Sequence, residues 1–318
     1  MRITSRRMRI SGVPLRTAFM TALCTAAALT SACHSESGDS DYIEIGQVPE
    51  VPARPNVGTW QTTCGNNENG HRNADNVVAQ PQLPNGAHHV HEYVGNLSTD
   101  AFSTNDTLAN AATTCQFGDK STYYWPVLRL IEERGHDEHA PGGGIHGNHG
   151  RILGPESVLI QFRGNPRSNV VAMPRFLRAI TGNPVAVSQQ GEHAERVQWT
   201  CSGARDRVTN RYPRCPEGQR VVRVFDFPSC WDGRNTDSQT HRTHLEFPVD
   251  DACKVGTFPV PQLHIEVAYA VPPGARYAID SFPEEGREPI TDHAMFIGVL
   301  PEQLMAQAVT CVNSGRQC

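Results

Sequence analysis

The sequence predicts a mainly β fold, a single β-sandwich-like domain with long loops, a few short helices and several disulfides. Glycine and proline are frequent, with 27 and 23 among 318 residues, and apolar periods of helical spacing are few. Short alternating stretches between turn-forming residues are typical of β-sandwiches. Apolar residues make up 38% of the chain and the mean hydropathy is −0.44, which indicates a soluble globular protein with enough chain for a core.

The N-terminus has the pattern of an export signal. Arginines precede an apolar run from Ala18 to Leu29, and small residues lead to Cys33. At about a dozen residues, this run is too short to span a bilayer in the mature protein. The end of the run also resembles a bacterial lipobox, in which residues 1–32 are removed and Cys33 becomes a lipidated first residue. We expect an extracytoplasmic protein anchored at the cell surface or periplasmic face, or a secreted one if cleavage occurs without lipidation.

The charge of the mature chain is acidic. Removing residues 1–32 takes away five of the 28 basic residues and none of the 33 acidic ones, so 23 basic residues face 33 acidic ones and the net charge is near −10. An excess of this sign argues against nucleic acid or an anionic membrane as the main partner. Contact with a membrane is expected only through the lipid at Cys33.

The cysteines that follow Cys33 in the chain predict a disulfide framework. An even number of cysteines in an exported chain indicates up to four bridges. The sequence has no CxxC pair, which argues against a zinc ribbon. The eight cysteines are Cys64, Cys115, Cys201, Cys215, Cys230, Cys253, Cys311 and Cys318. Their connectivity does not follow from the sequence, although Cys311–Cys318 would close a short loop and is the pairing we expect first.

Residues 34–57 are expected to form a flexible tether, because an acidic, serine-containing stretch precedes a proline-rich one. The domain itself is predicted at 58–318, with the folded part beginning near Trp60. Further strands are predicted at Ser121–Leu130, Ser157–Arg163, Asn169–Met173, Val185–Ser188, Val197–Cys201, Arg220–Phe225 and Arg276–Ile279. Helices are predicted from a cap at Thr104 or Asn105 through Ala112, and at Pro301–Thr310.

One predicted strand, His88–Val94, places His89, His91 and Tyr93 on the same face. Two histidines at this spacing can reach one metal ion through neutral imidazoles. Hydrogen bonding to loops or solvent is the alternative use of these side chains.

A second predicted strand, Pro261–Tyr269, alternates clearly between two faces. Its core-facing residues are Leu263, Ile265 and Val267. His264 and Glu266 share the other face, which a simple core strand does not require. If this strand neighbours His88–Val94, three histidines could bind one divalent ion and leave an open position, as a catalytic zinc does. The ligands expected on this interpretation are His89, His91 and His264.

The stretch Phe227 to His244, FPSCWDGRNTDSQTHRTH, has no hydrophobic period and is predicted to be an irregular loop, pinned by a disulfide at Cys230. Loops of this kind carry many functional sites. The candidate catalytic residues are Asp232, Asp237, His241, His244 and Glu266. The candidate substrate-binding residues are Trp231, Asn235, Tyr93 and Trp125. The alternative is that the acids and histidines of the loop only brace it through hydrogen bonds.

These motifs resemble those of the DUF1996 family, secreted fungal and bacterial domains with no assigned function. The resemblance rests on HxH, then YWPxL, then FPSCWDGxNxDSxxHxxH and finally PQLHxE, and it runs from about Trp60 to Cys311. It implies an exported single domain, in fungi sometimes joined to WSC modules that are associated with carbohydrate. The C-terminal block of the family usually carries a His, an acid and a Phe, followed by a Trp. Here His293 and Phe296 are kept, Met295 replaces the acid and the Trp is missing, so a role for that acid is in doubt in this chain.

Three hypotheses for function remain open at this point. In the first, a His/Asp-rich site of hydrolase or lyase type acts on a cell-wall or extracellular polysaccharide, with or without a metal. In the second, the protein is a non-catalytic glycan- or surface-binding lipoprotein with tryptophans as stacking platforms. In the third, the polar residues only knit the loops together. A nucleotide cofactor is not expected, because no GxGxxG or P-loop occurs in a βα setting. The wider polar set from which a site would be drawn also includes His293.

Overall fold

The computed structural model describes residues 39–135 and 139–318. The predicted export signal and Cys33 lie outside these residues. Within them, no helix has the length and apolar character needed to cross a membrane.

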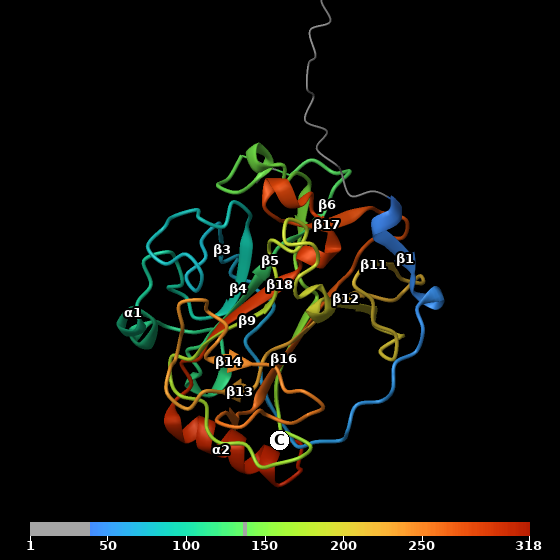
Figure 1. Ribbon diagram of the computed structural model, residues 1–318. Helices are drawn as coiled ribbons and strands as arrows, with labels where there is room; N and C mark the ends of the chain where they lie inside the picture. The colour runs from blue at the N-terminus through green and yellow to red at the C-terminus, as the bar shows by residue number, and fades with distance from the viewer. Residues whose placement is uncertain (1–38, 136–138) are drawn as a thin grey trace, which may run out of the picture. The chain divides into compact units, whose positions relative to one another are not determined.

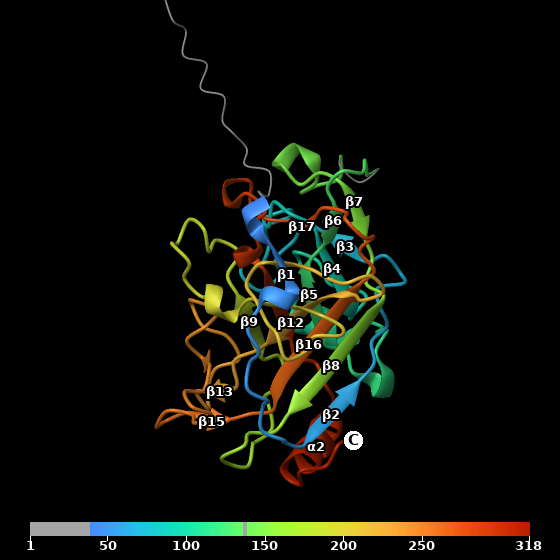
Figure 2. The same cartoon turned by 90° about the vertical axis from the view of Figure 1, so that its right-hand side faces the viewer.

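The mainly β prediction is confirmed, and two antiparallel five-stranded sheets dominate the fold. Sheet I, of which β16, β8 and β2 lie side by side facing the viewer in Figure 2, has the order β10 (Gln198–Cys201), β12 (Val221–Asp226), β16 (Gln262–Tyr269), β8 (Ser157–Arg163), β2 (Thr59–Thr62). Sheet II, whose strands lie side by side in Figure 1, has the order β3 (Arg72–Asn73), β4 (His91–Gly95), β5 (Thr122–Pro126), β18 (His293–Ile297), β9 (Arg178–Gly182).

Smaller elements surround these two sheets. The three-stranded sheets are β17 (Tyr277–Ile279), β6 (Leu128–Leu130), β7 (Arg151–Leu153) and β14 (Leu245–Glu246), β13 (Cys230–Trp231), β15 (Phe258–Pro259). A parallel pair joins β1 (Tyr42–Glu44) to β11 (Tyr212–Arg214). The helices are α1 (Asn105–Asn110) and α2 (Glu302–Asn313), and α2 lies beside β2 (Figures 1 and 2).

The hydrophobic core lies between sheets I and II, which makes the arrangement sandwich-like. Phe162 of sheet I packs against Phe296 of sheet II with 6.3 Å between ring centroids, and Phe225 stacks on Trp125 at 6.4 Å. The apolar face predicted for β16 is confirmed, because Leu263, Ile265 and Val267 are all buried in this core. Alternation along β16 therefore directs His264 and Glu266 to the outer face of sheet I.

Most predicted elements are present, with two exceptions. The helix before Ala112 begins at the predicted Thr104 cap, whose hydroxyl accepts from Thr107 N and completes a capping box. Residues 169–173 and 185–188, predicted as strands, form loop and turns instead. Asn183 and Pro184 precede the second of these, and the Asn183 side chain accepts from Val185 N, which favours a turn over an extended chain.

All eight cysteines that were expected to pair do so. The disulfides are Cys64–Cys115, Cys201–Cys215, Cys230–Cys253 and Cys311–Cys318, which confirms the pairing expected from sequence at the C-terminus.

Residues 42–48 pack against the rest of the fold, although they lie within 34–57, where a tether was expected. Tyr42 is buried and its hydroxyl accepts from Tyr277 N at 2.9 Å, and Ile45 and Val48 form a small apolar cluster with Cys201. Apolar residues scattered in an acidic stretch gave no periodic signal, so the sequence did not predict this packing.

Candidate metal centre

Three histidines meet at one end of sheet II. The Nε2 atom of His91 lies 3.2 Å from that of His89 and 3.2 Å from that of His293, and the third distance, between His89 and His293, is 3.3 Å. All three side chains are buried. Their Nε2 atoms therefore form a nearly equilateral triangle, closed off from solvent, which we call the histidine triangle.

The sheet register explains why two of these residues meet. His91 begins β4 and His293 begins β18, and both strands pair with β5 between them. His91 lies opposite Pro126 of β5, and continuing the pairing of Met295 with Tyr124 by two residues also places His293 opposite Pro126. Residues opposite one another project to the same face, so both imidazoles extend over the same point of the middle strand.

His89 reaches the triangle from outside the strand. The regular strand begins at His91, and His88 has a positive φ of 54°, which turns the chain just before His89. Gly142 packs against this turn with φ +80°, and a Cβ built on it would lie 2.9 Å from the His89 carbonyl carbon, so glycine is required there. The ring of Phe282 covers His89 with 5.1 Å between centroids.

The outer nitrogens of two imidazoles fix the direction of their lone pairs. His91 Nδ1 donates to the Asp75 carbonyl at 2.9 Å, and His293 Nδ1 donates to the Thr291 carbonyl at 2.9 Å. A ring that donates from Nδ1 in its neutral form carries its lone pair on Nε2. Nδ1 of His89 has no hydrogen-bond partner of ordinary geometry among the described residues, although the backbone of Ala87 acts to raise the pKa of this ring.

Two buried carboxylates hold the backbone that carries these ligands. Asp280 accepts from Val90 N at 3.2 Å, between the first two histidines, and Asp292 accepts from His293 N at 2.9 Å. Each carboxylate is clamped by a buried guanidinium: Arg129 Nε lies 2.7 Å from Asp280, and Arg223 Nε lies 3.0 Å from Asp292. Such outer contacts orient metal ligands in proteins.

The backbone beside His293 is packed equally closely. Gly182 of β9 pairs with His293 and has φ +72°, and a Cβ there would lie 2.0 Å from the Asp292 carbonyl oxygen. The Gly182 carbonyl accepts from Arg242 Nη2 at 2.7 Å, so a half-buried cation from the Phe227–His244 loop lies next to the triangle.

Burial keeps the three imidazoles neutral. It is the largest cause that lowers the pKa of His91 to about 3 and the pKa values of His89 and His293 well below the usual range. Repulsion from neighbouring imidazoles lowers the pKa of His89 and His293 further. Neutral imidazole is the form that binds a metal.

The structure does not bring all of the sequence-predicted ligands together, because His264 lies elsewhere. Its Nδ1 is 2.7 Å from Asp226 and its Nε2 is 3.3 Å from Glu266, on the outer face of sheet I. The strands that carry His91 and His264 belong to different sheets, so the neighbouring strands assumed from the sequence are separated by the core. His293 takes the third position instead. The sequence analysis included His293 in the wider polar set but not among the expected ligands. The signal that points to it is a polar residue at the start of an otherwise apolar strand.

The residues of the Phe227–His244 loop mostly bond to one another. Asp232 accepts from Arg234 N and Asn235 N, both at 2.9 Å, as in an Asx turn. His241 pairs with Asp237 at 2.9 Å. His244 bonds to Ser238 Oγ at 3.0 Å through Nδ1 and to the Arg178 carbonyl at 2.7 Å through Nε2.

The side chains of the aromatic candidates also bond to or stack on other residues of the fold. Trp231 Nε1 donates to the Asn235 carbonyl at 2.7 Å, and the side chain is only half-buried. Tyr93 is buried and stacks on Tyr124 with 4.9 Å between centroids. Trp125 is fully buried and donates to Glu92 at 2.9 Å. Neither buried ring offers a face for a ligand to stack on.

The chemistry of the histidine triangle suits a metal ion. Among the described residues, two groups have ligand atoms close enough to hold one. The other group contains Cys64 and Cys115, whose sulfurs form a disulfide, so it offers no thiolates. In the described part of the chain, no further His, Cys, Asp or Glu joins the triangle, so a bound ion would keep a position for water or another small ligand.

Comparison with known proteins identifies a family without an assigned function. A model described as "Domain of unknown function (DUF1996)" matches residues 75–290, more than half of the chain. The matched region contains His89 and His91 and ends just before His293. No match was found among curated proteins or solved structures.

Proposed function

We propose that this chain, which belongs to the DUF1996 family, is an exported metalloprotein that binds one zinc-type ion at the histidine triangle. The observation that carries the proposal is the convergence of the three Nε2 atoms in a buried place.

The direction of the lone pairs is the first support. His91 and His293 donate from Nδ1, so their neutral rings have no proton on Nε2 and cannot hydrogen-bond to each other across 3.2 Å. Lone pairs that face each other in a buried place repel. A cation among them removes this repulsion, and imidazole is the commonest protein ligand of transition metals.

The distances indicate which coordination geometry is favoured. Two nitrogens bound to a tetrahedral zinc ion at 2.0–2.1 Å are roughly 3.3–3.4 Å apart. The triangle has sides of 3.2, 3.2 and 3.3 Å, close to that value. A square-planar ion would need unequal separations, roughly 2.9 Å for adjacent and 4.1 Å for opposite ligands. Equal sides therefore favour zinc over square-planar copper(II) or nickel(II).

Three histidine ligands would leave one coordination position of a zinc ion open for water or a substrate group. A three-histidine zinc ion lowers the pKa of a bound water to about 7, which supplies hydroxide for hydrolysis. The guanidinium of Arg242 lies beside His293, through Gly182, and has no carboxylate partner within ion-pair distance among the described residues. It would favour an anionic substrate group or developing negative charge near that position. We propose hydrolysis as the reaction class. Because the three imidazoles are buried, a polysaccharide, the substrate class implied by the resemblance, would reach the ion only after the covering segments open.

The export route belongs to the same proposal. Four disulfides are typical of a chain that folds in an oxidising compartment outside the cytoplasm. We further propose that the protein is attached to a membrane through a lipid at Cys33. Mass spectrometry of the mature N-terminus tests this attachment.

Metal stoichiometry tests the proposal directly. The exported protein would be stripped of metal, incubated with zinc, desalted and measured for bound metal. We expect close to one equivalent in the wild type and a loss of most of it in the His91→Ala and His293→Ala variants. The matched control is His241→Ala, a histidine of the Phe227–His244 loop that already pairs with Asp237 and is expected to retain the metal.

Two results would contradict the metal site. One is the absence of tightly bound zinc, cobalt, copper or nickel at neutral pH. The other is equal metal content in wild type, His91→Ala and His293→Ala. If metal binds but no ester, amide or glycoside is hydrolysed, the metal site stands and the reaction class is wrong.

A further inference from the structure

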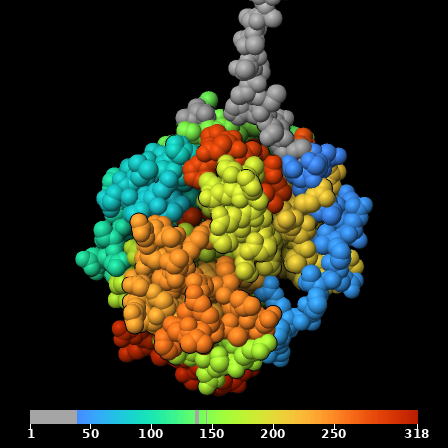
Figure 3. Space-filling model, in the orientation of Figure 1, coloured from blue at the N-terminus to red at the C-terminus, as the bar shows by residue number. Residues whose placement is uncertain are grey.

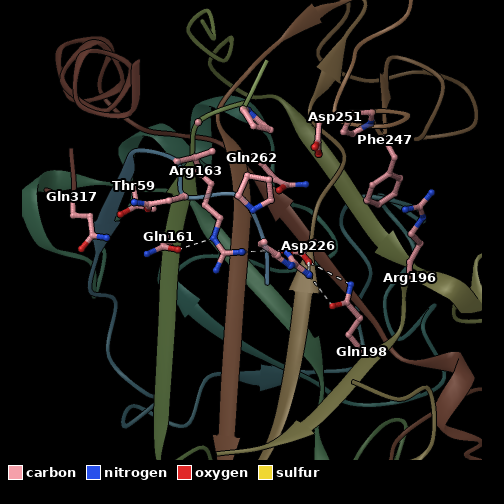
Figure 4. Close-up of a pocket in the computed structure, with 17 residues that line it drawn as sticks. Thr59, Gln161, Arg163, Arg196, Gln198, Asp226, Phe247, Asp251, Gln262 and Gln317 are labelled. Carbon is pink, nitrogen blue, oxygen red and sulfur yellow. Dashed lines mark hydrogen bonds and ion pairs between the residues drawn. The ribbon is translucent and has the colours of Figure 1, made fainter. Parts of the chain in front are cut away.

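A second concave site lies on the outer face of sheet I, away from the histidine triangle. Its volume is about 600 Å³, which is within the range of small-molecule sites. Strands β8, β16, β12 and β10 form its floor, and the extended segment 54–57 and the loop 247–251 form walls (Figure 4). We call it the sheet I cavity.

The lining of this cavity is rich in side-chain amides. Four glutamines face it, one from each of three strands of sheet I and one from the C-terminal loop. They are Gln161, Gln198, Gln262 and Gln317. An amide both donates and accepts hydrogen bonds, as a hydroxyl group does.

Several of these amide groups keep unused hydrogen-bonding capacity. Gln161 Oε1 accepts from Arg163 at 2.7 Å, which leaves its amino group without a partner among the described residues. Gln262 does the reverse: its amino group donates to the Phe227 carbonyl at 3.1 Å, and its oxygen has no partner in the described structure. Gln317 makes no side-chain hydrogen bond to a described residue, and its backbone is fixed beside Thr59 within the Cys311–Cys318 loop. Donors and acceptors are thus both available.

The charges in and beside the cavity balance. Asp226 is neutralised by Arg54, whose Nη2 lies 2.5 Å away, and accepts from His264 at 2.7 Å. Arg196 lies over the ring of Phe247, 3.9 Å from the centroid, with Glu195 3.1 Å from its Nε. Arg163 also pairs with Asp226, at 3.7 Å, so the lining itself holds three arginines and two aspartates, the second being Asp251. Each of the three arginines is already paired with an acid, so none is left to neutralise an anionic ligand.

We infer that the sheet I cavity binds a neutral saccharide. Hydroxyl groups that donate and accept at once match the mixed amide and guanidinium lining, and the balanced charge favours an uncharged ligand over a uronate or a phosphate. The inference concerns a different site from the metal centre and does not depend on it.

Binding to defined oligosaccharides tests the inference. The exported protein would be screened against short neutral oligosaccharides of glucose, xylose and mannose, and against uronate-containing counterparts of similar length. Affinities for the best ligand would then be measured by calorimetry with metal present and after chelation. We expect binding to neutral members, weaker or no binding to the uronates, and no change on removing metal.

Two substitutions of similar volume locate the binding site. Gln161→Leu combined with Gln262→Leu removes the unused amide groups and should weaken binding by roughly tenfold or more, because two hydrogen bonds to the ligand are lost. The control is Gln307→Leu on the exposed face of α2, outside the cavity, with unchanged affinity. Thermal melting confirms that each variant is folded.

Any one of four results would overturn the inference. They are no binding to any neutral oligosaccharide, preference for the uronates, an unchanged affinity in the double glutamine variant, or loss of binding in His91→Ala. The last would place the ligand at the metal centre.

Discussion

The histidine triangle and the Phe227–His244 loop both contain histidines and acids, but they use them in opposite ways. In the loop, His244 bonds through both ring nitrogens and His241 bonds to Asp237. In the triangle, the three Nε2 atoms have only one another within hydrogen-bond distance among the described residues. The loop and the residues that follow it in the chain form the orange region on the surface in Figure 3, whereas the triangle is buried.

This comparison teaches that the density of polar residues in a sequence is a poor guide to a site. A loop without a regular backbone ladder needs side chains to satisfy its own peptide groups, and Asp232 does this for two of them. In the triangle, the Nδ1 atoms of His91 and His293 bond to peptide carbonyls, whereas the Nε2 atoms face one another. Among the described residues its Nε2 atoms meet only one another, and one proton shared among three of them cannot satisfy them all, which is costly in a buried place unless they bind something.

The largest expected difference between the two regions is in stability. Asp292→Asn leaves the buried Arg223 without its counter-ion, and loss of one partner of a buried pair costs about 3–5 kcal/mol. Asp237→Asn in the loop removes a partly exposed carboxylate, for which about 1 kcal/mol or less is expected. Chemical denaturation of both variants measures the free energies of unfolding.

The same variants also separate the two regions by metal affinity. Asp292 accepts from the His293 backbone, so its replacement should weaken metal binding roughly 10- to 100-fold. Asp280→Asn, which releases Val90 N, should act in the same direction. Equal stability and equal metal affinity in Asp292→Asn and Asp237→Asn would show that the carboxylates beside the triangle do not position it.

A smaller effect is expected from the buried histidine of the loop. His244→Ala removes two hydrogen bonds, each worth about 1 kcal/mol, so the protein should lose about 2 kcal/mol of stability. Metal content should not change. A His244→Ala protein of normal stability that fails to bind metal would place this histidine in the metal centre and break the distinction drawn above.

The smallest effect concerns pH and a third polar group, on the outer face of sheet I. Burial alone would raise the pKa of Glu266, but the hydrogen bond from His264 and the charge of Arg205 outweigh it and lower the pKa to about 2. An unfolded glutamate titrates near about 4.3. The contribution of Glu266 to stability is therefore complete above about pH 4.3 and is lost as pH falls toward 2.

Unfolding measured between neutral pH and about pH 3 checks this. We expect wild type to lose on the order of 1 kcal/mol more than Glu266→Gln over that interval, since partial exposure weakens the pair. An identical pH dependence in the two proteins would contradict the assigned role of Glu266.

The sequence predicted the scaffold better than the site, for physical reasons. Alternation along Pro261–Tyr269 reports burial of one face, so it predicted both the core residues and the outward position of His264. It says nothing about which sheet neighbours which, and the pairing of β16 with β8 and β12 separates His264 from His91. His293 joins His91 only through the shared middle strand β5, a contact between residues 202 positions apart in the chain.

Anomalous diffraction at the zinc absorption edge, from crystals of the zinc-loaded exported protein, would locate the metal at the histidine triangle or elsewhere. We expect one strong peak about 2.0–2.1 Å from the Nε2 atoms of His89, His91 and His293, with a non-protein ligand completing a tetrahedron. A peak at His241, His244 or His264, or no peak at the triangle in fully loaded protein, would contradict this expectation.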